Sequence, residues 1–377
     1  MDFVFWLLSY VVPFLAVLTI IVFVHEMGHY LVARWNGIAI QTFSIGFGPE
    51  LLGFNDRKGT RWRLSAIPLG GYVRFVGDMN AASVPDEAFI EQASPELKKQ
   101  LFVNKNVWQR ISVVFAGPVA NIIFTLLVLY ALLLGYGRYT IPAVLDTVPV
   151  ESVAGQAGLA NGDRILSVDG YAVRGFEDFQ RLIATAPERQ VSITFERGGR
   201  TETITAVPQA VSTPDRFGNT QRVGRLGVTK NVAQADVVLY RPNPVEAVGM
   251  TFEEVRFIID RTVAFLGDFF VGRGDVEQLG GPVKVAAVSQ QVASLGIVPL
   301  INLMALLSLN IGIFNLLPIP MLDGGHLAYY IAEAIRGRPL PQRVQEIGYR
   351  FGLALVFTLM LFTTFNDTVL SYLRSLG

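Results

Sequence analysis

The chain has 377 residues, of which 51% are hydrophobic and 16% are charged, and this composition is too apolar for an ordinary soluble domain. Its 31 basic and 31 acidic side chains cancel, so nothing in the charge suggests a nucleic-acid partner. Cysteine is absent, which excludes disulfides, thiolate nucleophiles and cysteine-ligated metal sites. We therefore expect a membrane protein in which histidine, aspartate or glutamate holds any metal ion.

Four apolar segments are long enough to cross a hydrocarbon core of about 30 Å, which needs about 20 helical residues. They lie at about residues 3–33, 111–134, 296–322 and 347–370. The sequence predicts an α-helical polytopic membrane protein with four transmembrane helices. We divide it into a first helix (1–37), a β-meander with a loop (38–106), a second helix (107–137), a small domain (138–232), an amphipathic region (233–294), a third helix (295–326), a connection (327–346) and a fourth helix with the C-terminus (347–377).

Basic residues flank the spans unevenly. None precedes the first span, whereas several follow it or lie between the third and fourth spans: Arg34, Arg57, Lys58, Arg61, Arg63, Arg336, Arg338, Arg343 and Arg350. The positive-inside tendency places these two connections in the cytoplasm and both termini outside it. Asp2 stands where a signal peptide has a basic region, so we expect the first span to be retained rather than cleaved.

The segment after the first span alternates apolar and polar residues. IAIQTFSIGFG predicts a strand, NDRKG a turn, TRWRLSAI a second strand, and YVRFV a third strand after a Pro-Gly-Gly turn. These strands form a small antiparallel meander. Two placements remain open, a cytoplasmic hairpin domain and a sheet that dips into the protein-lined part of the membrane.

Residues 138–232 have the composition of a small soluble domain, with short strands, turns and one helix at FEDFQRLIATA. The orientation of the spans places this domain outside the cytoplasm. After it, Asn243 and Pro244 predict the start of an amphipathic helix, with Glu246 at the position of a capping-box carboxylate. Packing of this helix on a membrane surface and in an ordinary core are both open.

The first span carries the motif HEMGH, in which His25 and His29 are four residues apart. On a helix both imidazoles project from one face, so both can reach one metal ion. Glu26 lies beside them as a general base, the arrangement of zinc peptidases with an H-E-x-x-H motif. The alternative is a chance match at a helix end. Ionisable groups inside a span are costly to bury and usually functional, which favours a Zn²⁺ site.

A catalytic zinc ion needs a third protein ligand. Asp323 is the only acidic residue of the third span, in the stretch NLLPIPMLDGGH, where two prolines break the helix. We predict that Asp323 is this ligand; the alternative is a carboxylate at a helix end in water. His326 is the other candidate ligand, and a supporting role is the second interpretation of it. The helical rise from the basic flank places the histidines about 7 to 14 Å inward, within the bilayer toward its cytoplasmic side.

Cleavage inside a membrane requires the substrate helix to unwind locally, because its carbonyls are hydrogen-bonded and shielded. Asn310 and Asn315 could hold the freed backbone, and an edge of the meander could pair with it as an added strand. The alternative for both asparagines is hydrogen bonding between spans.

Together, HEMGH, AGPVAN in the second span, PLGGYVRF after the meander and NLLPIPMLDGGH make the chain resemble the site-2 proteases, specifically the bacterial RseP-type intramembrane metalloproteases. The resemblance implies His25, His29 and Asp323 as zinc ligands and Glu26 as catalytic base. It also implies that Asn315, and less surely Asn310, contacts substrate. The family's meander is a membrane-re-entrant sheet, so the resemblance favours that placement.

Residues 138–232 resemble a PDZ domain, through AGQAGLANGDRILSVDGYAV and through GRLGV at residues 224–228. The second motif is similar to the peptide-carboxylate loop of a circularly permuted PDZ domain, with Leu226, Gly227 and Val228 as backbone donors. A purely steric filter against bulky substrates is the alternative. We find one extracytoplasmic PDZ domain, whereas the better-known enterobacterial pattern has two.

The resemblance implies regulated intramembrane proteolysis in a bacterial inner membrane. Its expected partners are the lipid bilayer, single-span substrates such as anti-sigma factors and signal-peptide remnants, and an upstream site-1-type protease that trims them first. One rival is an inactive membrane-anchored PDZ adaptor or chaperone, whose structural metal site His326 would complete. A zinc transporter is a weaker rival, because the sequence shows one site rather than a relay of intramembrane ionisable residues.

Overall fold

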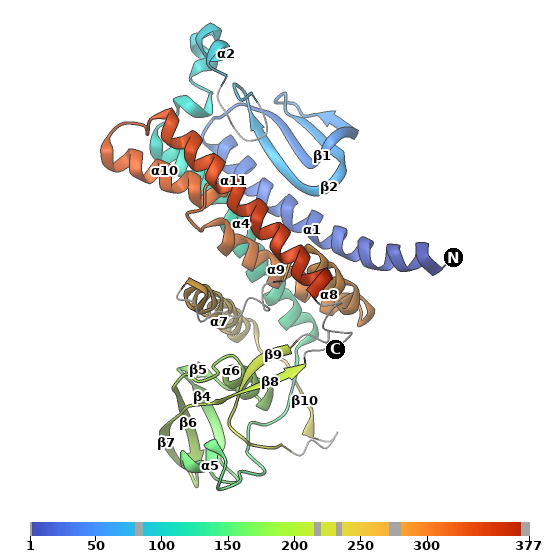
Figure 1. Ribbon diagram of the computed structural model, residues 1–377, viewed down its shortest axis with the longest axis vertical. Coiled ribbons are helices and arrows are strands. Elements are labelled where there is room, and N and C mark those ends of the chain that lie inside the picture. The colour runs from blue at the N-terminus through green and yellow to red at the C-terminus, as the bar shows by residue number, and fades with distance from the viewer. Residues whose placement is uncertain (1, 80–85, 215–219, 231–235, 271–279, 371–377) are drawn as a thin grey trace. The chain divides into compact units, whose positions relative to one another are not determined.

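The computed structural model describes residues 2–79, 86–214, 220–230, 236–270 and 280–370, which form two compact units (Figure 1). The first unit comprises residues 1–129 and 280–377, and the second comprises residues 130–279. We describe each unit by itself.

Long apolar helices make up most of the first unit. They are α1 (Asp2–Trp35), α4 (Val107–Tyr136), α9 (Ile297–Asn315) and α11 (Gln342–Phe365), the last continued by the π-helical segment η4 (Asn366–Leu370). Within the described residues, four helices are long and apolar enough to cross a membrane: Ser9–Trp35, Val107–Tyr136, Ile297–Asn315 and Arg343–Thr368. The four predicted spans therefore correspond to helices of suitable length.

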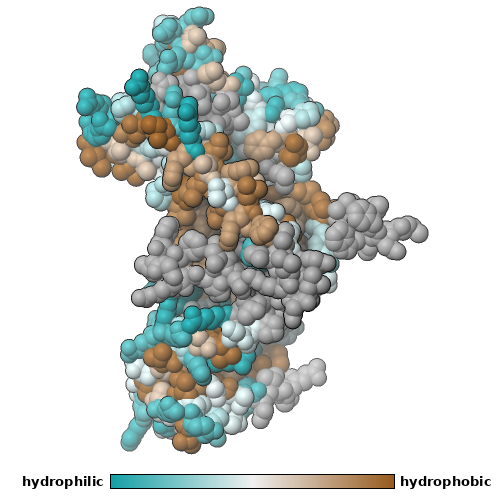
Figure 2. All heavy atoms as spheres, in the orientation of Figure 1, coloured by the Kyte–Doolittle hydropathy of each residue, from teal (hydrophilic) through white to brown (hydrophobic). Residues whose placement is uncertain are grey.

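The surface of these helices is apolar, as contact with lipid requires. Figure 2 shows mainly hydrophobic side chains over the helices of the first unit and hydrophilic ones around α2. On α11, Phe351, Phe357 and Leu361 are 64%, 53% and 55% exposed, which would be unfavourable in water and suits a bilayer.

The third span is shorter than predicted. Instead of running to residue 322, α9 ends at Asn315, and a separate helix, α10 (Asp323–Arg336), begins at Asp323. Pro318 and Pro320 explain the break, because proline lacks the N–H that a continuing helix needs. A Cβ on Gly324 would overlap the Leu317 carbonyl oxygen, so only glycine lets the turn fold back this tightly.

Short helices complete the first unit: α2 (Glu87–Gln92), α3 (Pro95–Lys98), the 3-10 helix η1 (Phe102–Asn104) and α8 (Pro282–Ser294). The start of α8 is capped from outside the helix. Asp367 Oδ2, in η4, accepts hydrogen bonds from the Gly281 and Lys284 N–H groups at 2.9 and 3.0 Å. These two bonds hold the end of the fourth span against α8.

The predicted three-stranded meander is instead two long, bent strands, β1 (Ile40–Asn55) and β2 (Arg61–Phe75). The residues expected to separate the second and third strands, 68–71, lie within β2. Phe43 lies opposite Val73 on one side and opposite Trp62 on the other, so residues 42–45 are the middle of the sheet. Residues 71–75 form one edge of it and residues 50–55 pair with 61–65 at the other.

Aromatic contacts and one carboxylate fasten this sheet to the end of α1. Tyr30 packs against Phe43 and Trp62 with ring centroids 5.7 and 5.0 Å apart. Asp56, in the turn between the strands, accepts hydrogen bonds from the Tyr30 hydroxyl at 3.0 Å and the Trp62 indole at 3.2 Å. The sheet edge at residues 71–75 is thereby placed beside the HEMGH segment of α1.

Small residues let the helices of the first unit approach closely. A Cβ on Gly28 of α1 would overlap the Ala116 carbonyl oxygen of α4, and one on Gly312 of α9 would lie 3.1 Å from the Pro118 carbonyl oxygen. Close approach of helix backbones at small residues is typical of membrane helix pairs. It brings α4 against the histidine-bearing face of α1.

The second unit combines small antiparallel sheets with two short helices and one long helix. Its elements are β3 (Arg138–Thr140), α5 (Val153–Gln156), β4 (Arg164–Val168), β5 (Tyr171–Ala172), α6 (Phe176–Ala184), β6 (Val191–Arg197), β7 (Arg200–Ala206), β8 (Gln209–Pro214), β9 (Thr220–Arg225), β10 (Val238–Tyr240) and α7 (Pro244–Phe270). The sheets are ordered β5-β4-β6-β7, β8-β9 and β10-β3. The predicted helix at FEDFQRLIATA is α6, and its apolar residues are buried in the core.

The predicted amphipathic helix is α7, and part of it belongs to the core of the second unit. Asn243 Oδ1 accepts a hydrogen bond from the Glu246 N–H at 3.0 Å, as the predicted cap requires. The Glu246 carboxylate accepts from the Tyr240 hydroxyl, a different partner from the reciprocal one expected of a capping box. Phe257 of α7 is 6% exposed and packs with the core of the small domain, so this unit extends beyond residue 232.

Candidate metal centre

Two histidines of α1 and one aspartate of α10 converge on a single point. Asp323 Oδ2 lies 3.1 Å from His25 Nε2 and 3.5 Å from His29 Nε2, and the two Nε2 atoms are 3.2 Å apart. Within the described part of the chain, no other three His, Cys, Asp or Glu side chains bring their potential ligand atoms this close together. The break between α9 and α10 places Asp323 at this point.

The geometry of these three side chains fits a zinc ion. Two ligand atoms that are each about 2.1 Å from a tetrahedral ion lie about 3.4 Å apart, close to the observed separations. Asp323 Oδ2 is buried and faces the Nε2 atoms of both histidines, and a cation bound between these three atoms would offset the cost of burying the carboxylate. Two imidazoles and one carboxylate are a donor set that zinc prefers.

The face of α4 that packs against α1 supports both histidines. His29 Nδ1 lies 2.8 Å from the Val113 carbonyl oxygen, and His25 Nδ1 lies 3.2 Å from Asn121 Nδ2. A Cβ on Gly117 would overlap His29 Nε2, so glycine is needed where α4 passes the rings. The sequence motif AGPVAN contains Gly117 and Asn121, but sequence reasoning gave neither residue a role in the site. An amide and a glycine four residues apart in an apolar span were the available signal.

Glu26 lies where α1 meets the edge of the β-sheet. Its carboxylate lies close to the backbone of Val73 in β2. A Cβ on Gly71 would lie 3.2 Å from Glu26 Cγ and 2.9 Å from a Val22 methyl group, so this edge can approach α1 closely only with glycine there. The carboxylate is thus held between the histidines of its own helix and the backbone of β2.

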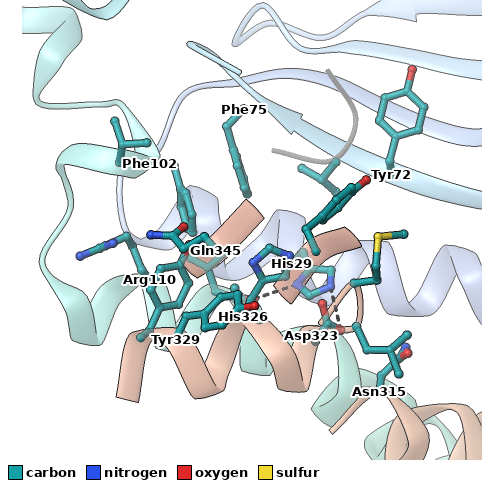
Figure 3. A pocket seen from close by; sticks show the side chains of 18 of the residues that line it. His29, Tyr72, Phe75, Phe102, Arg110, Asn315, Asp323, His326, Tyr329 and Gln345 are labelled. Carbon is teal, nitrogen blue, oxygen red and sulfur yellow. Dashed lines mark hydrogen bonds and ion pairs between the residues drawn. The ribbon is translucent and has the colours of Figure 1, made fainter. Parts of the chain in front are cut away.

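A cavity of about 550 Å³ opens beside these residues, and Glu26 and His326 are among those that line it. Figure 3 shows His29, Asp323 and Asn315 toward one end of the cavity, and Arg110 and Gln345 toward the other. Volume of this size accommodates a short length of extended peptide as well as water. The three candidate metal ligands therefore face a cavity large enough to admit a peptide segment.

The remaining predicted residues lie in different places. Asn315 Nδ2 is 3.5 Å from His25 Nε2 and lines the cavity. Asn310 Nδ2 donates to the Leu306 carbonyl oxygen of its own helix at 3.1 Å. His326 lines the cavity but is not a member of the three-residue group.

The predicted PDZ loop belongs to the second unit. Leu226 is buried, and its carbonyl oxygen accepts a hydrogen bond from the Ala154 N–H at 2.9 Å. Gly227 adopts a φ of 77°, which favours glycine, and Val228 packs partly against the core.

Comparison with known proteins identifies the family. The model of peptidase family M50 matches residues 13–359. A zinc metalloprotease by name from Mesorhizobium japonicum is 48% identical over 361 residues, covering 96% of this chain and 98% of the relative. A relative of the same description from Agrobacterium fabrum is 45% identical, covering 96% of each chain. Metalloprotease MmpA of Caulobacter vibrioides is 36% identical, covering 94% of each chain.

Among solved structures, the PDZ domain of an SdrC-like protein from Listeria monocytogenes matches 23% of this chain and 83% of its own length, at 22% identity and a TM-score of 0.18. The family match over most of the length, the whole-length relatives and the His-His-Asp group together show that the chain belongs to peptidase family M50, the site-2 protease family of zinc metalloproteases.

Proposed function

We propose that this metalloprotease is an intramembrane endopeptidase that cleaves within the transmembrane segments of single-span membrane proteins. The observation that carries this proposal is the position of His25 and His29 inside the candidate span Ser9–Trp35. They lie roughly 7 to 14 Å along the helix from Arg34, at a helical rise of about 1.5 Å per residue. A metal centre at that depth has the interior of a bilayer as its surroundings.

The chemistry assigned to the side chains follows from their positions. A zinc ion bound by the three ligands would act as a Lewis acid and activate water for attack on a peptide carbonyl. Glu26, adjacent in sequence to His25 and lining the same cavity, accepts the proton from that water and returns it to the leaving amine. The Asn315 amide, beside His25, hydrogen-bonds the substrate backbone near the scissile bond.

Substrate binding uses the edge of the β-sheet formed by residues 71–75. Edge strands offer backbone groups to which an extended peptide adds as another strand. Gly71, Tyr72 and Val73 line the cavity next to Glu26, so a strand added there would have its carbonyls close to the metal ligands. A locally unwound substrate helix recovers in this way some of the hydrogen bonds that it loses.

The proposed setting is a bacterial inner membrane, with both termini and the PDZ domain in the periplasm and the active site toward the cytoplasmic side. The β1–β2 sheet is membrane-re-entrant in this proposal. Leu51, Leu52 and Phe54 of β1 support it, because they are 62%, 70% and 62% exposed and would be unfavourable in water.

The proposed substrates have been trimmed by an upstream site-1-type protease and are of two kinds, anti-sigma factors and remnant signal peptides. The second unit is proposed as a single PDZ domain. It either binds newly exposed peptide ends through the backbone of Leu226, Gly227 and Val228, or excludes bulky substrates sterically. Trimming would in both cases precede entry of the substrate.

The rival proposal, an inactive adaptor with a structural metal site, expects His326 to close a four-ligand site. The grouped ligands are His25, His29 and Asp323, with Glu26 on the same cavity, and this arrangement supports a catalytic site with an open position.

Mapping the cleaved bond tests the proposed function. The full-length protein would be reconstituted with a single-span substrate in lipid vesicles, and the product termini identified by mass spectrometry, with zinc-free protein as background. We expect new termini within the apolar segment. Termini found only in the flanking soluble segments would show that the protein is a juxtamembrane peptidase instead.

A further inference from the structure

Asn121 is an amide buried in an apolar helix. It is 0% exposed on α4, and its Oδ1 has no hydrogen-bond partner among the described residues. Burying an amide oxygen without a partner is unfavourable, so an unpaired one in a folded protein calls for a physical reason. The other polar atom of the side chain, Nδ2, lies 3.2 Å from His25 Nδ1.

The metal site determines which atom of His25 carries the proton. His25 Nε2 faces Asp323 and His29, so this is the nitrogen whose lone pair would bind a metal ion held by the three side chains. A neutral imidazole has one proton, which then lies on Nδ1 and makes that atom a donor. An amide Nδ2 opposite it would be a second donor, and two donors cannot form a hydrogen bond.

Rotating the amide by a half turn resolves this conflict, because amide oxygen and nitrogen are nearly the same size and their assignment is interchangeable. We propose that Asn121 is a positioning residue of the metal centre, whose Oδ1 accepts a hydrogen bond from His25 Nδ1–H. The rotation places Nδ2 where Oδ1 stood. The exchange is favourable because the N–H of a metal-bound imidazole is a stronger donor than an amide N–H.

His29 already shows the same arrangement. Its Nδ1 lies 2.8 Å from the carbonyl oxygen of Val113, which can only accept. With Asn121 turned, α4 supplies one acceptor to each histidine, and both Nε2 atoms remain directed at the metal. Such hydrogen bonds to ligating histidines set the ring orientation, and their loss typically weakens metal binding about 10- to 100-fold.

The backbone of Asn121 is itself held in place. Its carbonyl oxygen accepts from the Thr125 hydroxyl at 2.9 Å and from the Ser308 hydroxyl at 3.3 Å. A Cβ on Gly312 of α9 would lie 3.2 Å from Asn121 Cβ, so α9 closes the space behind the side chain. The amide therefore can turn about its own bond but has little room to move away from His25.

Zinc affinity of the purified full-length protein in detergent tests this assignment, measured with Zn²⁺ alone against a chromophoric chelator. Asn121→Leu removes the acceptor at similar volume and should weaken zinc binding about 10- to 100-fold. Asn121→Asp keeps an oxygen acceptor in either rotamer and should bind zinc at least as tightly as the unchanged protein. Ser289→Ala, on α8, removes a buried hydroxyl that bonds to its own helix rather than to Asn121 or the histidines, and should leave the affinity unchanged.

Equal zinc affinity of Asn121→Leu and the unchanged protein would overturn the proposal. So would equal losses in the Leu and Asp variants, because they would indicate a steric role rather than an acceptor. If the Leu variant does not fold, the Asp variant decides the question, and a loss of zinc affinity beyond tenfold in folded Asn121→Asp contradicts the assignment. The His25 Nδ1–H proton resonance in the zinc-loaded protein gives a second readout, expected to be slow to exchange only when residue 121 is an acceptor.

Discussion

Gly117 makes room for the two histidine rings on the face of α4, and the zinc site depends on that space. Gly117→Ala should displace the His29 ring, because the added Cβ would overlap His29 Nε2. We expect loss of most of the bound zinc, measured as metal per protein by atomic emission. Gly135→Ala, on the same helix with no described atom within 4 Å of its Cβ position, is the matched control and should retain zinc. Full zinc content in Gly117→Ala would contradict the geometry.

At Gly71 a small change should separate metal binding from turnover. A methyl group there would meet the Ser44 carbonyl oxygen, a Val22 methyl group and Glu26 Cγ, and no metal ligand is among these three nearest contacts. Gly71→Ala should therefore lower kcat while zinc content stays at one ion per protein. Loss of zinc in this variant would show that the sheet edge supports the ligands rather than the base.

The ligands and the base could be predicted from sequence because each is a rare ionisable residue in an otherwise apolar span, and the chain has only three histidines. Gly71, Gly117 and Asn121 could not, since their roles exist only where β2 and α4 meet α1. A glycine in a sequence does not reveal which side chain passes over it. Pairing of residues this far apart along the chain depends on the tertiary fold.

Among the elements, the β1–β2 turn carries a strongly acidic carboxyl group. Burial opposes ionisation of Asp56, but hydrogen bonds from the Thr60 N–H and the Trp62 indole outweigh burial and lower the pKa of Asp56 to about 2. Its unfolded pKa is about 3.9, so the charged form stabilises the hairpin above that pH. We expect this stabilisation to be lost as the pH falls from about 4 through about 2.

Amide hydrogen exchange of Lys58 and Thr60, whose N–H groups donate to Asp56 at 2.8 and 2.9 Å, would follow this change. The exchange rates, corrected for intrinsic pH dependence, should rise across that acid interval and stay constant above it. Asp56→Asn should show no such transition. A transition of equal size in the variant would assign it to another group.

The end of α9 is the element that sequence reasoning placed least well. Hydropathy extended the span to residue 322, because the segment stays apolar through both prolines, although these prolines were expected to break its helix. In the structure the chain turns after Asn315, and α11 packs on that turn: a Cβ on Gly352 would overlap the Pro320 carbonyl oxygen. The end of α9 is set by its contact with α11 and by the backbone geometry of the two prolines. A hydropathy pattern does not contain this information.

Gly352→Leu should accordingly disturb the turn that carries Asp323. We expect weaker zinc binding, whereas Leu353→Ala at the neighbouring, 48% exposed position should leave it unchanged. Chelator competition in detergent measures both variants. Unchanged affinity in Gly352→Leu would mean that α11 does not support the metal ligand.

At the scale of the whole molecule, zinc binding should stabilise only the first of the two units. All three ligands lie in residues 1–129 and 280–377, and the core of the second unit contains none of them. Binding to the folded state stabilises by about 4 kcal/mol when zinc is at 1,000 times its dissociation constant. Chelation should therefore increase hydrogen exchange in α1 and α10 and leave the β6–β7 pair unchanged. Equal loss of protection in both units would contradict this division.

The four membrane-spanning helices and the metal-ligand motifs HEMGH and LDGGH could be predicted from sequence, because apolar length and ligand spacing each have a direct physical cause. The bent two-stranded sheet could not be predicted, because the alternation of apolar and polar residues does not show which strand segment pairs on both sides. The extension of the second unit to include α7 could not be predicted either, because an amphipathic pattern does not show what packs on the apolar face of a helix.

Substituting Glu26→Gln tests the central claim most directly. The amide cannot accept a proton from water, yet it has nearly the same shape and leaves His25, His29 and Asp323 in place. Zinc content and cleavage of a reconstituted single-span substrate would be measured on the same preparation. We predict full zinc occupancy with no detectable cleavage, and cleavage at the unchanged rate by the zinc-loaded variant would contradict the assignment of this site as a zinc endopeptidase.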